Sequence, residues 1–344
     1  MMSAVSMIFR IIEPMMFRGP GEFDPFVRGT YSRAATLAMP SPSTVAGALA
    51  TYCIAELWRQ IPKSEDWIER YMEVLGDDVR VRGPLLKLGG NLMVEDRLLK
   101  GFLDMEGVRR KCEVEHGRLV QNPSDELDTP EESLPIVRAR GNPRTGIMLE
   151  MRTDSPMKAP REGFLYTAEY IDYLGVKRRE TSVEIVSEVR GGIAKRLCGG
   201  AAPIRFGGEN RVSLLFFREG EEILNDIEKR VWGGGGRYEG ILALYLATPA
   251  LFRGGKRVKE RVKEWAEEMN WKFLGISGES AVLGAGFDIG RGKRKPIYTS
   301  LNPGSIVFLE GSFDLKQIYL DASLGEASSL GYGTLIPVPL NQSR

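Results

Sequence analysis

The first residues that could bind a ligand follow an apolar run, Val5 to Ile12, which leads into Glu13-Pro14-Met15-Met16-Phe17-Arg18-Gly19. Further on, Pro40-Ser41-Pro42-Ser43-Thr44 predicts the start of a helix, with Ser41 as its N-cap. Backbone N–H groups at a helix start and arginine guanidinium groups both bind phosphate oxygens, so this region predicts a phosphate site. A capped helix packed on its sheet is the alternative, because capping needs no ligand. The candidate phosphate-binding residues are Arg18, Arg28, Arg33, Ser41, Ser43, Thr44 and Gly47.

Two glycine-bearing segments and one basic segment add further candidates. Arg205-Phe206-Gly207-Gly208-Glu209-Asn210-Arg211 places a paired-glycine turn between arginines, with Glu209 available to orient a guanidinium. A plain hairpin turn explains the glycines there but not both arginines. The small residues of the segment 325–333 predict an anion-binding nest of backbone N–H groups, beside a tyrosine able to stack on a base. The candidates are Arg205, Gly207, Gly208, Arg211, Lys293, Arg294, Lys295, Gly325, Gly331, Tyr332 and Gly333.

Catalytic chemistry has few residues to work with. His116 is the sole histidine, which disfavours Ser-His-Asp triads and histidine-based zinc sites. Its context, Glu115-His116-Gly117-Arg118, predicts an exposed turn. Gly254-Gly255-Lys256 is followed by Arg257 instead of serine or threonine, so it is not a Walker A element. We therefore expect no enzyme activity, no metal and no cofactor.

Composition bounds the class of protein. A chain of 344 residues with 42% hydrophobic and 27% charged residues predicts a globular protein of two domains. We find no apolar run long enough to cross a bilayer, and the scattered Cys53, Cys112 and Cys198 favour a reducing compartment, so a cytoplasmic location is expected. Abundant charged residues beside few glutamines are typical of thermophilic proteins. The net charge of +1 excludes nucleic-acid binding by bulk charge alone and requires local basic clusters.

Hydrophobic periodicity predicts the helices and strands that carry these residues. Helices are predicted over 44–59, 67–75 and 258–269. Residues 111–157, rich in Pro, Gly, Ser and charge, predict an exposed insertion or hairpin. The glycine run after Trp232 predicts a domain junction at 233–236. Strands are predicted over 7–12, 79–93, 164–174, 183–189, 211–218, 241–247, 272–276, 281–289, 305–309 and 335–338.

Several motifs together resemble a known family. EPMMFRG, PSPSTVAGALA, PIRFGGENR, KRKPIYTSLNPGSIVFLEG and SSLGYGTLIPVPL, in this order along the chain, are similar to the RAMP superfamily of CRISPR proteins. Within it, they most resemble the third-numbered subunit of the type III-B (Cmr) effector complex. Residues 107–134 carry none of these motifs. The resemblance implies an α+β fold of two tandem ferredoxin-like (RRM-like) domains with inserted loops and hairpins. The first would span 1–220, with an insertion around 107–160, and the second 237–344, with the glycine-rich loop.

The resemblance also implies a role. It is that of a non-catalytic subunit that binds the 5′ repeat-derived tag of the CRISPR RNA (crRNA) and docks on the large polymerase-like subunit. It would also contact a backbone RAMP subunit of the same complex, away from any membrane. Two alternatives stay open: a CRISPR-transcript-processing RAMP endoribonuclease using His116 as general acid or base, and a backbone or capping RAMP subunit that binds guide or target RNA.

Overall fold

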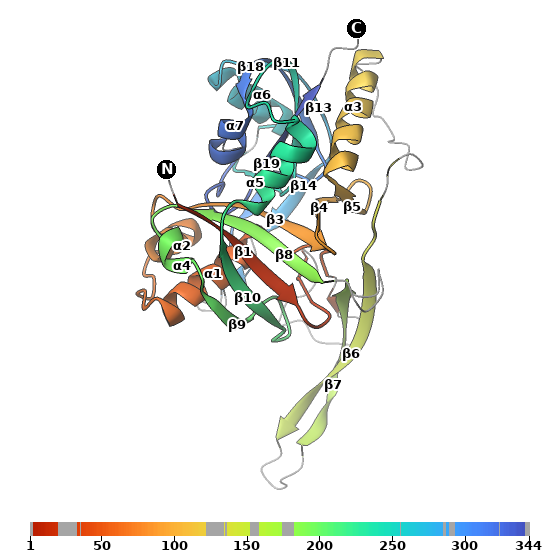
Figure 1. Cartoon of the computed structure of the whole chain (residues 1–344). Helices are drawn as coiled ribbons and strands as arrows, with labels where there is room; N and C mark the ends of the chain where they lie inside the picture. Colours follow the sequence, from red (N-terminus) through yellow and green to blue (C-terminus); the bar gives the residue numbers. More distant parts are fainter. Residues whose placement is uncertain are drawn as a thin grey trace.

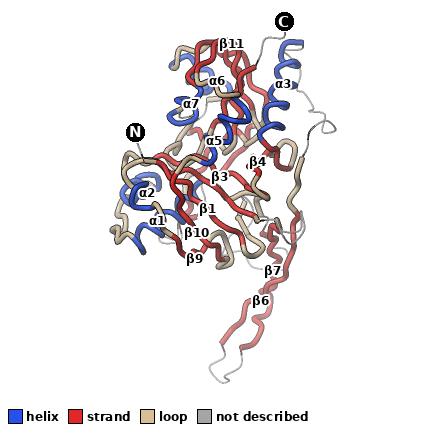
Figure 2. Tube along the Cα trace, in the orientation of Figure 1, coloured by secondary structure: helices blue, strands red, loops and turns tan. Residues whose placement is uncertain are grey.

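The computed structural model describes residues 3–19, 33–34, 36–121, 134, 136–151, 158–173, 182–254, 256–284, 287–288, 293–322 and 324–340. Within these ranges, helices pack on sheets whose strands pair antiparallel, apart from one short parallel pair at β2 and β7. Figures 1 and 2 show two adjoining bodies of sheet and helix, from which one long hairpin projects.

The larger sheet has seven strands in the order β5-β4-β3-β8-β1-β10-β9. Its central strand β8 is buried along its whole length, because layers cover both faces of the sheet. Helices α1 (Pro42–Glu56), α2 (Trp67–Leu75) and α4 (Ala194–Leu197) pack on one face. The strands are β1 (Ala4–Ile11), β3 (Arg80–Leu88), β4 (Asn91–Asp96), β5 (Gly101–Asp104), β8 (Val183–Arg190), β9 (Ala201–Arg205) and β10 (Val212–Glu219).

The second sheet has four strands in the order β13-β18-β11-β19. The two sheets share the same series of elements along the chain: a strand, a helix, two strands, a helix and a strand. They also share the same order in space. If the four strands of each series are numbered along the chain, they lie side by side in the order second, third, first, fourth. In the larger sheet this series is β1, α1, β3, β8, α4 and β10. Its counterparts are β11 (Arg237–Leu246), α6 (Val258–Glu268), β13 (Lys272–Ser277), β18 (Ile306–Asp314), α7 (Leu315–Asp321) and β19 (Leu335–Leu340).

Smaller elements complete the fold. The projecting hairpin pairs β6 (Arg140–Met151) with β7 (Lys158–Asp172), and β2 (Arg33–Ala34) lies beside β7 (Figure 1). A three-stranded sheet has the order β12-β17-β14. Its strands and the remaining elements are β12 (Ala250–Phe252), β14 (Ser280–Gly284), β15 (Phe287–Asp288), β16 (Lys293–Arg294), β17 (Ile297–Leu301), α3 (Met105–Gln121), α5 (Glu222–Ile227) and a π-helix (Glu228–Trp232).

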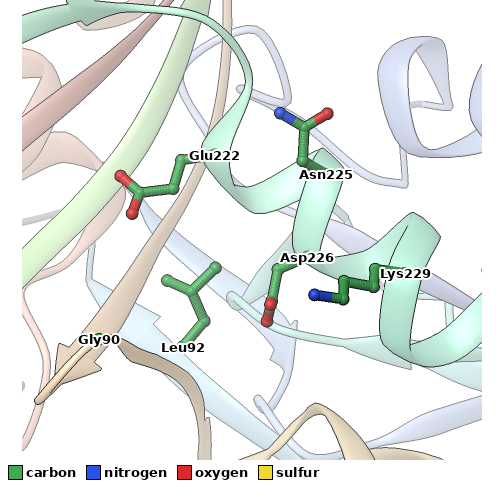
Figure 3. Close-up of a pocket in the computed structure, with 6 residues that line it drawn as sticks. All are labelled: Gly90, Leu92, Glu222, Asn225, Asp226 and Lys229. Carbon is green, nitrogen blue, oxygen red and sulfur yellow. The ribbon is translucent and has the colours of Figure 1, made fainter.

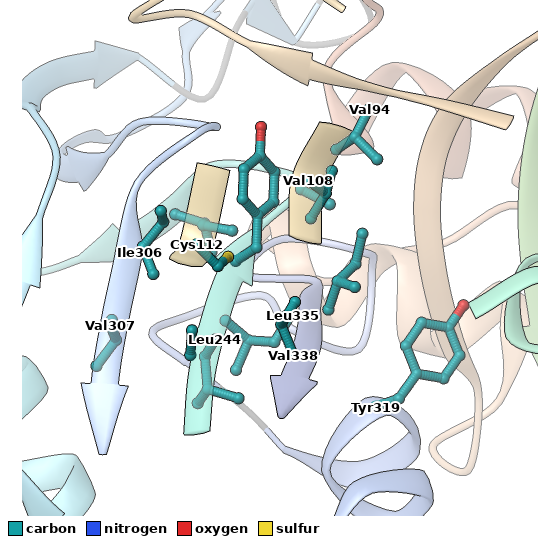
Figure 4. Packing of buried hydrophobic residues seen from close by; sticks show 14 of the residues in the cluster. Val94, Val108, Cys112, Leu244, Ile306, Val307, Tyr319, Leu335 and Val338 are labelled. Atoms are coloured by element: carbon teal, nitrogen blue, oxygen red, sulfur yellow. The ribbon is translucent and has the colours of Figure 1, made fainter. Parts of the chain in front are cut away.

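The two larger sheets share one hydrophobic core. Ile8, Leu85 and Val186 of the seven-stranded sheet belong to the same buried cluster as Leu244 and Val307 of the four-stranded sheet; Figure 4 shows part of this packing. Alternate residues of β1, such as Met7 and Phe9, face the separate cluster under α1 and α2. A strand buried on both faces favours consecutive apolar residues, as Met7, Ile8 and Phe9 are in the middle of β1.

A buried polar latch also joins the two sheets. The Arg82 guanidinium, on β3, donates to the Tyr319 carbonyl at 2.6 Å, to the Ser328 carbonyl at 3.2 Å and to the Leu320 carbonyl. The Tyr319 hydroxyl in turn donates to Glu188 on β8 at 2.9 Å. Arg82 therefore binds carbonyls at the C-terminal end of α7, where a cation is favourable.

Agreement with the sequence predictions is closest for α2, whose bounds are as predicted, and for β8 and β10. The prediction for 111–157 is wrong in its first part, since residues through Gln121 continue helix α3. His116 lies on that helix and is half-buried, not in an exposed turn. The polar residues that suggested a solvated segment include Lys111, which is 1% exposed and paired with buried Asp96 at 2.6 Å.

Among the residues described, no helix is long and apolar enough to span a bilayer.

Candidate nucleic-acid interface

The chain after β1 is held between β7 and the segment before α1. Met15 and Ile171 exchange backbone hydrogen bonds of 3.0 and 2.7 Å, and Arg18 forms a bridge with Thr36. The backbone of Arg33, in β2, lies beside Thr167 of β7. Arg18 and Arg33 therefore lie at anchored positions on either side of residues 20–32 in the sequence. Arg28 lies outside the described residues.

The β9–β10 turn packs directly on this segment. The Gly208 N–H donates to the Met16 carbonyl at 2.7 Å. Gly207 has φ +85°, and a Cβ there would lie 2.5 Å from the Met16 oxygen, so the close approach of the two backbones requires glycine. The fold thus joins two groups of candidates that are far apart in sequence. We call Arg18, Arg205, Gly207, Gly208 and Glu209 the arginine–glycine cluster.

Two exposed cations lie in the arginine–glycine cluster. The Arg18 side chain is 45% exposed, and its guanidinium lies 3.3 Å from Glu209, so Glu209 does pair with an arginine. Arg205 is exposed at the end of β9. An exposed ion pair such as Arg18–Glu209 is weak, so a phosphate can replace the carboxylate at little cost.

Arg211, by contrast, has a structural environment. It pairs with Glu13 and stacks on the ring of Tyr170, with the guanidinium carbon 4.4 Å from the ring centroid. Glu13 also accepts from the Val212 N–H at 2.8 Å. Sequence analysis did not single out Glu13 or Tyr170. The only sequence signal for Glu13 is a carboxylate that follows an apolar strand. This signal is too common to identify Glu13 as the partner of a distant arginine.

The start of α1 is closed, where an open phosphate site was predicted. Ser41 is the N-cap and accepts from the Thr44 N–H at 3.3 Å, and Ser43 is buried. Tyr71 donates to the Ser43 carbonyl at 3.2 Å and lies in ordinary contact with Gly47. The phenol of Tyr332 hydrogen-bonds with Ser43 and Ser41, and burial raises the pKa of Tyr332. The helix N-terminus is therefore satisfied within the protein.

The C-terminal glycine-rich loop provides this cover. Gly331 has φ +98°, and a Cβ there would lie 2.6 Å from the Gly83 carbonyl. Gly325 and Gly333 also have positive φ, and a Cβ on either would collide with a backbone carbonyl. Tyr332 is 1% exposed and meets Trp67 edge-on, with ring centroids 6.2 Å apart. Tyr332 was predicted to stack on a base, but in this structure neither face of its ring is exposed.

The basic segment 293–295 borders the same aromatic group. The Lys295 ammonium lies 5.1 Å from the ring centroid of Trp67 and 5.3 Å from that of Tyr71, and 3.3 Å from the Tyr71 hydroxyl. Lys295 thus makes cation–π contacts inside the protein. Lys293 and Arg294 form β16, of which only the backbone is described.

Two further polar features of the described residues are His116 and a hollow on the surface. His116 packs 5.9 Å from Phe308, and burial lowers the pKa of His116. No group of three potential metal ligands occurs in the described part of the chain. An open hollow of about 230 Å³ lies beside α5. Its acidic residues Glu222 and Asp226 pair with Lys87 and Arg230. Figure 3 shows the residues that line it. The lining residues are Gly90, Leu92, Glu222, Asn225, Asp226 and Lys229.

Comparison with known proteins gives consistent matches. A family model described as "CRISPR-associated protein (Cas_Cmr3)" matches residues 95–340. A protein of Saccharolobus solfataricus named "CRISPR system CMR subunit Cmr3" is 23% identical over 311 residues, covering 87% of this chain and 84% of the relative.

Two solved structures share the fold. A chain of the type III-B Cmr-beta complex bound to cognate target RNA, solved by cryo-electron microscopy, matches with a TM-score of 0.59 and 20% identity over 96% of both chains. A chain of the same kind of complex, bound to target RNA and AMPPnP, matches with a TM-score of 0.54 and 20% identity. That match covers 88% of this chain and 86% of the other.

Proposed function

Because this chain belongs to the Cas_Cmr3 family of CRISPR-associated proteins, we propose that it is a non-catalytic subunit of a type III-B effector complex that holds the 5′ repeat-derived tag of the crRNA. The tag would bind at the arginine–glycine cluster. The subunit would dock on the large polymerase-like subunit and contact a backbone RAMP subunit.

The observation that carries this proposal is the exposed Arg18 guanidinium beside the β9–β10 turn, whose glycines lie against the Met16 backbone, with exposed Arg205 at the end of β9 just before that turn. Guanidinium groups supply phosphate contacts, and the glycines leave the backbone accessible beside them. The sequence between Arg18 and Arg33 includes Arg28 with Phe23, Phe26 and Tyr31. Aromatic residues next to cations are what single-stranded RNA binding requires.

A binding role without catalysis is supported by the position of His116. The ring lies on α3 against Phe308, packed towards the four-stranded sheet and not within the arginine–glycine cluster. A general acid or base must reach the reacting group. The endoribonuclease alternative is therefore the less favoured one.

We also propose that the chain comprises two ferredoxin-like domains, residues 1–220 and 237–344. The support is the shared series of elements and the shared strand order of the two sheets. On this proposal β4, β5, β9 and the β6–β7 hairpin are additions to the first domain.

The test is a reconstituted complex carrying crRNA with a photoreactive nucleotide at each position of the 5′ tag and, in a second set of crRNAs, at positions of the guide region. We expect crosslinks to peptides within 13–37 and 203–211 of this chain, and their loss in the double variant Arg18→Ala/Arg205→Ala. Arg237→Ala, an exposed arginine on β11, is the matched control. Crosslinks from the guide region alone would instead support the backbone or capping alternative.

A further inference from the structure

Trp58 is displayed on the surface in an unfavourable backbone conformation. Its side chain is 89% exposed, although tryptophan is normally much more buried. Its φ is +54°, in the left-handed region that bulky residues rarely adopt. Within the described residues, the indole ring has no aromatic or cationic neighbour. An exposed and strained residue of this kind indicates a function outside the packing of the chain.

The surrounding structure fixes the Trp58 backbone. The N–H groups of Leu57 and Arg59 both donate to the Cys53 carbonyl, at 3.1 Å each, and so end helix α1 on either side of Trp58. The Arg196 guanidinium, from α4, donates to the Leu57 carbonyl at 3.1 Å. The indole is therefore held out from the surface by a preorganised turn, which reduces the entropic penalty of binding.

The surface around Trp58 is apolar at its centre and charged at its edge. Ile61 is 75% exposed, and Leu57 is half-buried. Two arginines lie at the edge of this surface: the Arg196 guanidinium is held at the Leu57 carbonyl, and Arg59 directly follows Trp58 in the chain. The Arg59 Nε atom is buried and has no hydrogen-bond partner. Tryptophan and arginine are the residue types that most often dominate protein–protein binding.

We propose that Trp58 is the anchor by which this chain docks on another protein subunit of its effector complex. The indole would enter an apolar pocket of that subunit, and carboxylates at the pocket rim would meet Arg59 and Arg196. This inference rests on the proposed function and deepens it, since it names the docking surface.

Protein is favoured over RNA as the occupant by the composition of this surface. Ile61 has no π face on which a base can stack, yet it is nearly as exposed as Trp58. The carboxylates of Glu56 and Glu65 lie in the same stretch of chain and are exposed, where they would repel phosphates. An apolar centre with charges of both signs at its edge is typical of a protein interface.

The test compares wild type with Trp58→Gly and Trp58→Phe. Each of the other protein subunits of the complex, the crRNA and the chain itself are passed in turn over the immobilised chain, and the melting temperature of each variant is recorded. We expect Trp58→Gly to weaken binding of one subunit at least about 30-fold. We expect its melting temperature to stay level or rise, because glycine favours a positive φ. Trp58→Phe should restore part of the affinity, and Ile297→Ala, which removes a side chain 70% exposed elsewhere, should bind like wild type.

Four other outcomes would overturn this inference. Wild-type affinity of Trp58→Gly for every subunit excludes the anchor. Loss of crRNA affinity with subunit binding intact assigns Trp58 to RNA, and loss of a self-association seen in wild type assigns it to a second copy. If wild type binds neither crRNA nor any subunit, the proposed function itself is wrong. If wild type binds a subunit and Trp58→Gly binds it equally well, only the anchor is wrong.

Discussion

At the scale of single residues, the arginines divide by their partners. Arg211 is neutralised by Glu13 and covered by Tyr170, whereas Arg18 keeps an exposed guanidinium beside Glu209. From sequence alone Arg18 and Arg211 qualified equally as phosphate ligands. Their carboxylate partners, Glu209 and Glu13, lie about two hundred positions away along the chain, and only the fold brings them together. Arg18 is thus the better candidate for an RNA contact, and Arg211 for support of the β9–β10 turn.

Arg18→Ala is expected to reduce the salt dependence of crRNA binding. Removal of one phosphate-binding guanidinium should lower the slope of log K against log salt by about 0.7 for a single strand. Arg211→Ala should instead lower the melting temperature, because it leaves Glu13 without its guanidinium partner. Filter binding of the reconstituted complex at several salt concentrations measures the slope, with Arg237→Ala as control. A wild-type slope in Arg18→Ala would remove Arg18 from the RNA-binding residues.

Neither wild type nor His116→Ala is expected to cleave RNA, because the half-buried histidine ring packs on Phe308 and is not part of the arginine–glycine cluster proposed to hold RNA. The assay incubates repeat RNA with each protein, with and without divalent ions. Robust cleavage by wild type that His116→Ala abolishes would restore the endoribonuclease alternative.

At the scale of elements, the glycine-rich loop is a packing element. It covers the start of α1 and lies against β3, where Leu330 bridges to Val81. Its glycines predicted an anion-binding nest, and the same positive φ values and close approaches are needed to bury the loop. Small residues that admit a ligand and small residues that admit a neighbouring backbone have the same sequence signature.

Gly333→Ala is expected to destabilise the chain more than Gly233→Ala. Both glycines have φ +64°, so both substitutions incur the cost of a left-handed alanine, about 1–2 kcal/mol. A Cβ at 333 would also collide with the Leu324 carbonyl, whereas the space at 233 is open, which adds about 1–3 kcal/mol. Chemical denaturation measures both values. Equal destabilisation would show that the loop yields to the added carbon.

Elements with plain periodicity were predictable. Helix α2 was predicted to the residue, since Asp66 caps it and Gly76 follows it. Helix α3 was missed, because buried Lys111 and Glu115 made its pattern look solvated. Lys111 is satisfied by Asp96 and by the Gly304 carbonyl, partners that no local pattern reveals. The sequence identified the residues of the arginine–glycine cluster as candidates but did not predict that they come from two segments that pack together. It did not identify Trp58 as a candidate.

At the scale of the whole molecule, the two sheets pack against each other around one core. They share a hydrophobic cluster, and the latch of Arg82, Tyr319 and Glu188 crosses between them. The sequence predicted a junction at 233–236, and that exposed run does connect the two sheets. The extent of their packing could not be predicted, because the apolar face that β1, β3 and β8 offer to the second sheet looks like any other core face.

Glu188→Gln is expected to flatten the pH dependence of stability. Burial raises the pKa of Glu188 above its ordinary value of 4.5, although hydrogen bonds from Leu224 and Tyr319 oppose the rise. The folded state then holds the proton more tightly than the unfolded state. The free energy of unfolding should therefore fall as the pH rises from about 4.5 through the raised pKa. Glutamine cannot titrate, so this part of the decline should disappear.

Denaturant unfolding of wild type and Glu188→Gln across this pH range measures the effect. Burial also raises the pKa of Glu95, so a residual decline remains expected in the variant. Glu310→Gln, which changes an exposed carboxylate, serves as control. Identical pH profiles for wild type and Glu188→Gln would mean that Glu188 does not titrate in this range.

The cover that the glycine-rich loop places on α1 has a consequence for biosynthesis. The first turn of α1 and the ring of Trp67 receive their final neighbours only when Tyr332 of residues 325–333 arrives. At translation rates of roughly 5–20 residues per second, α1 leaves the ribosome some tens of seconds before that loop. The nascent chain therefore carries an uncovered aromatic surface through most of its synthesis, and early chaperone contacts are expected to concentrate on α1 and α2.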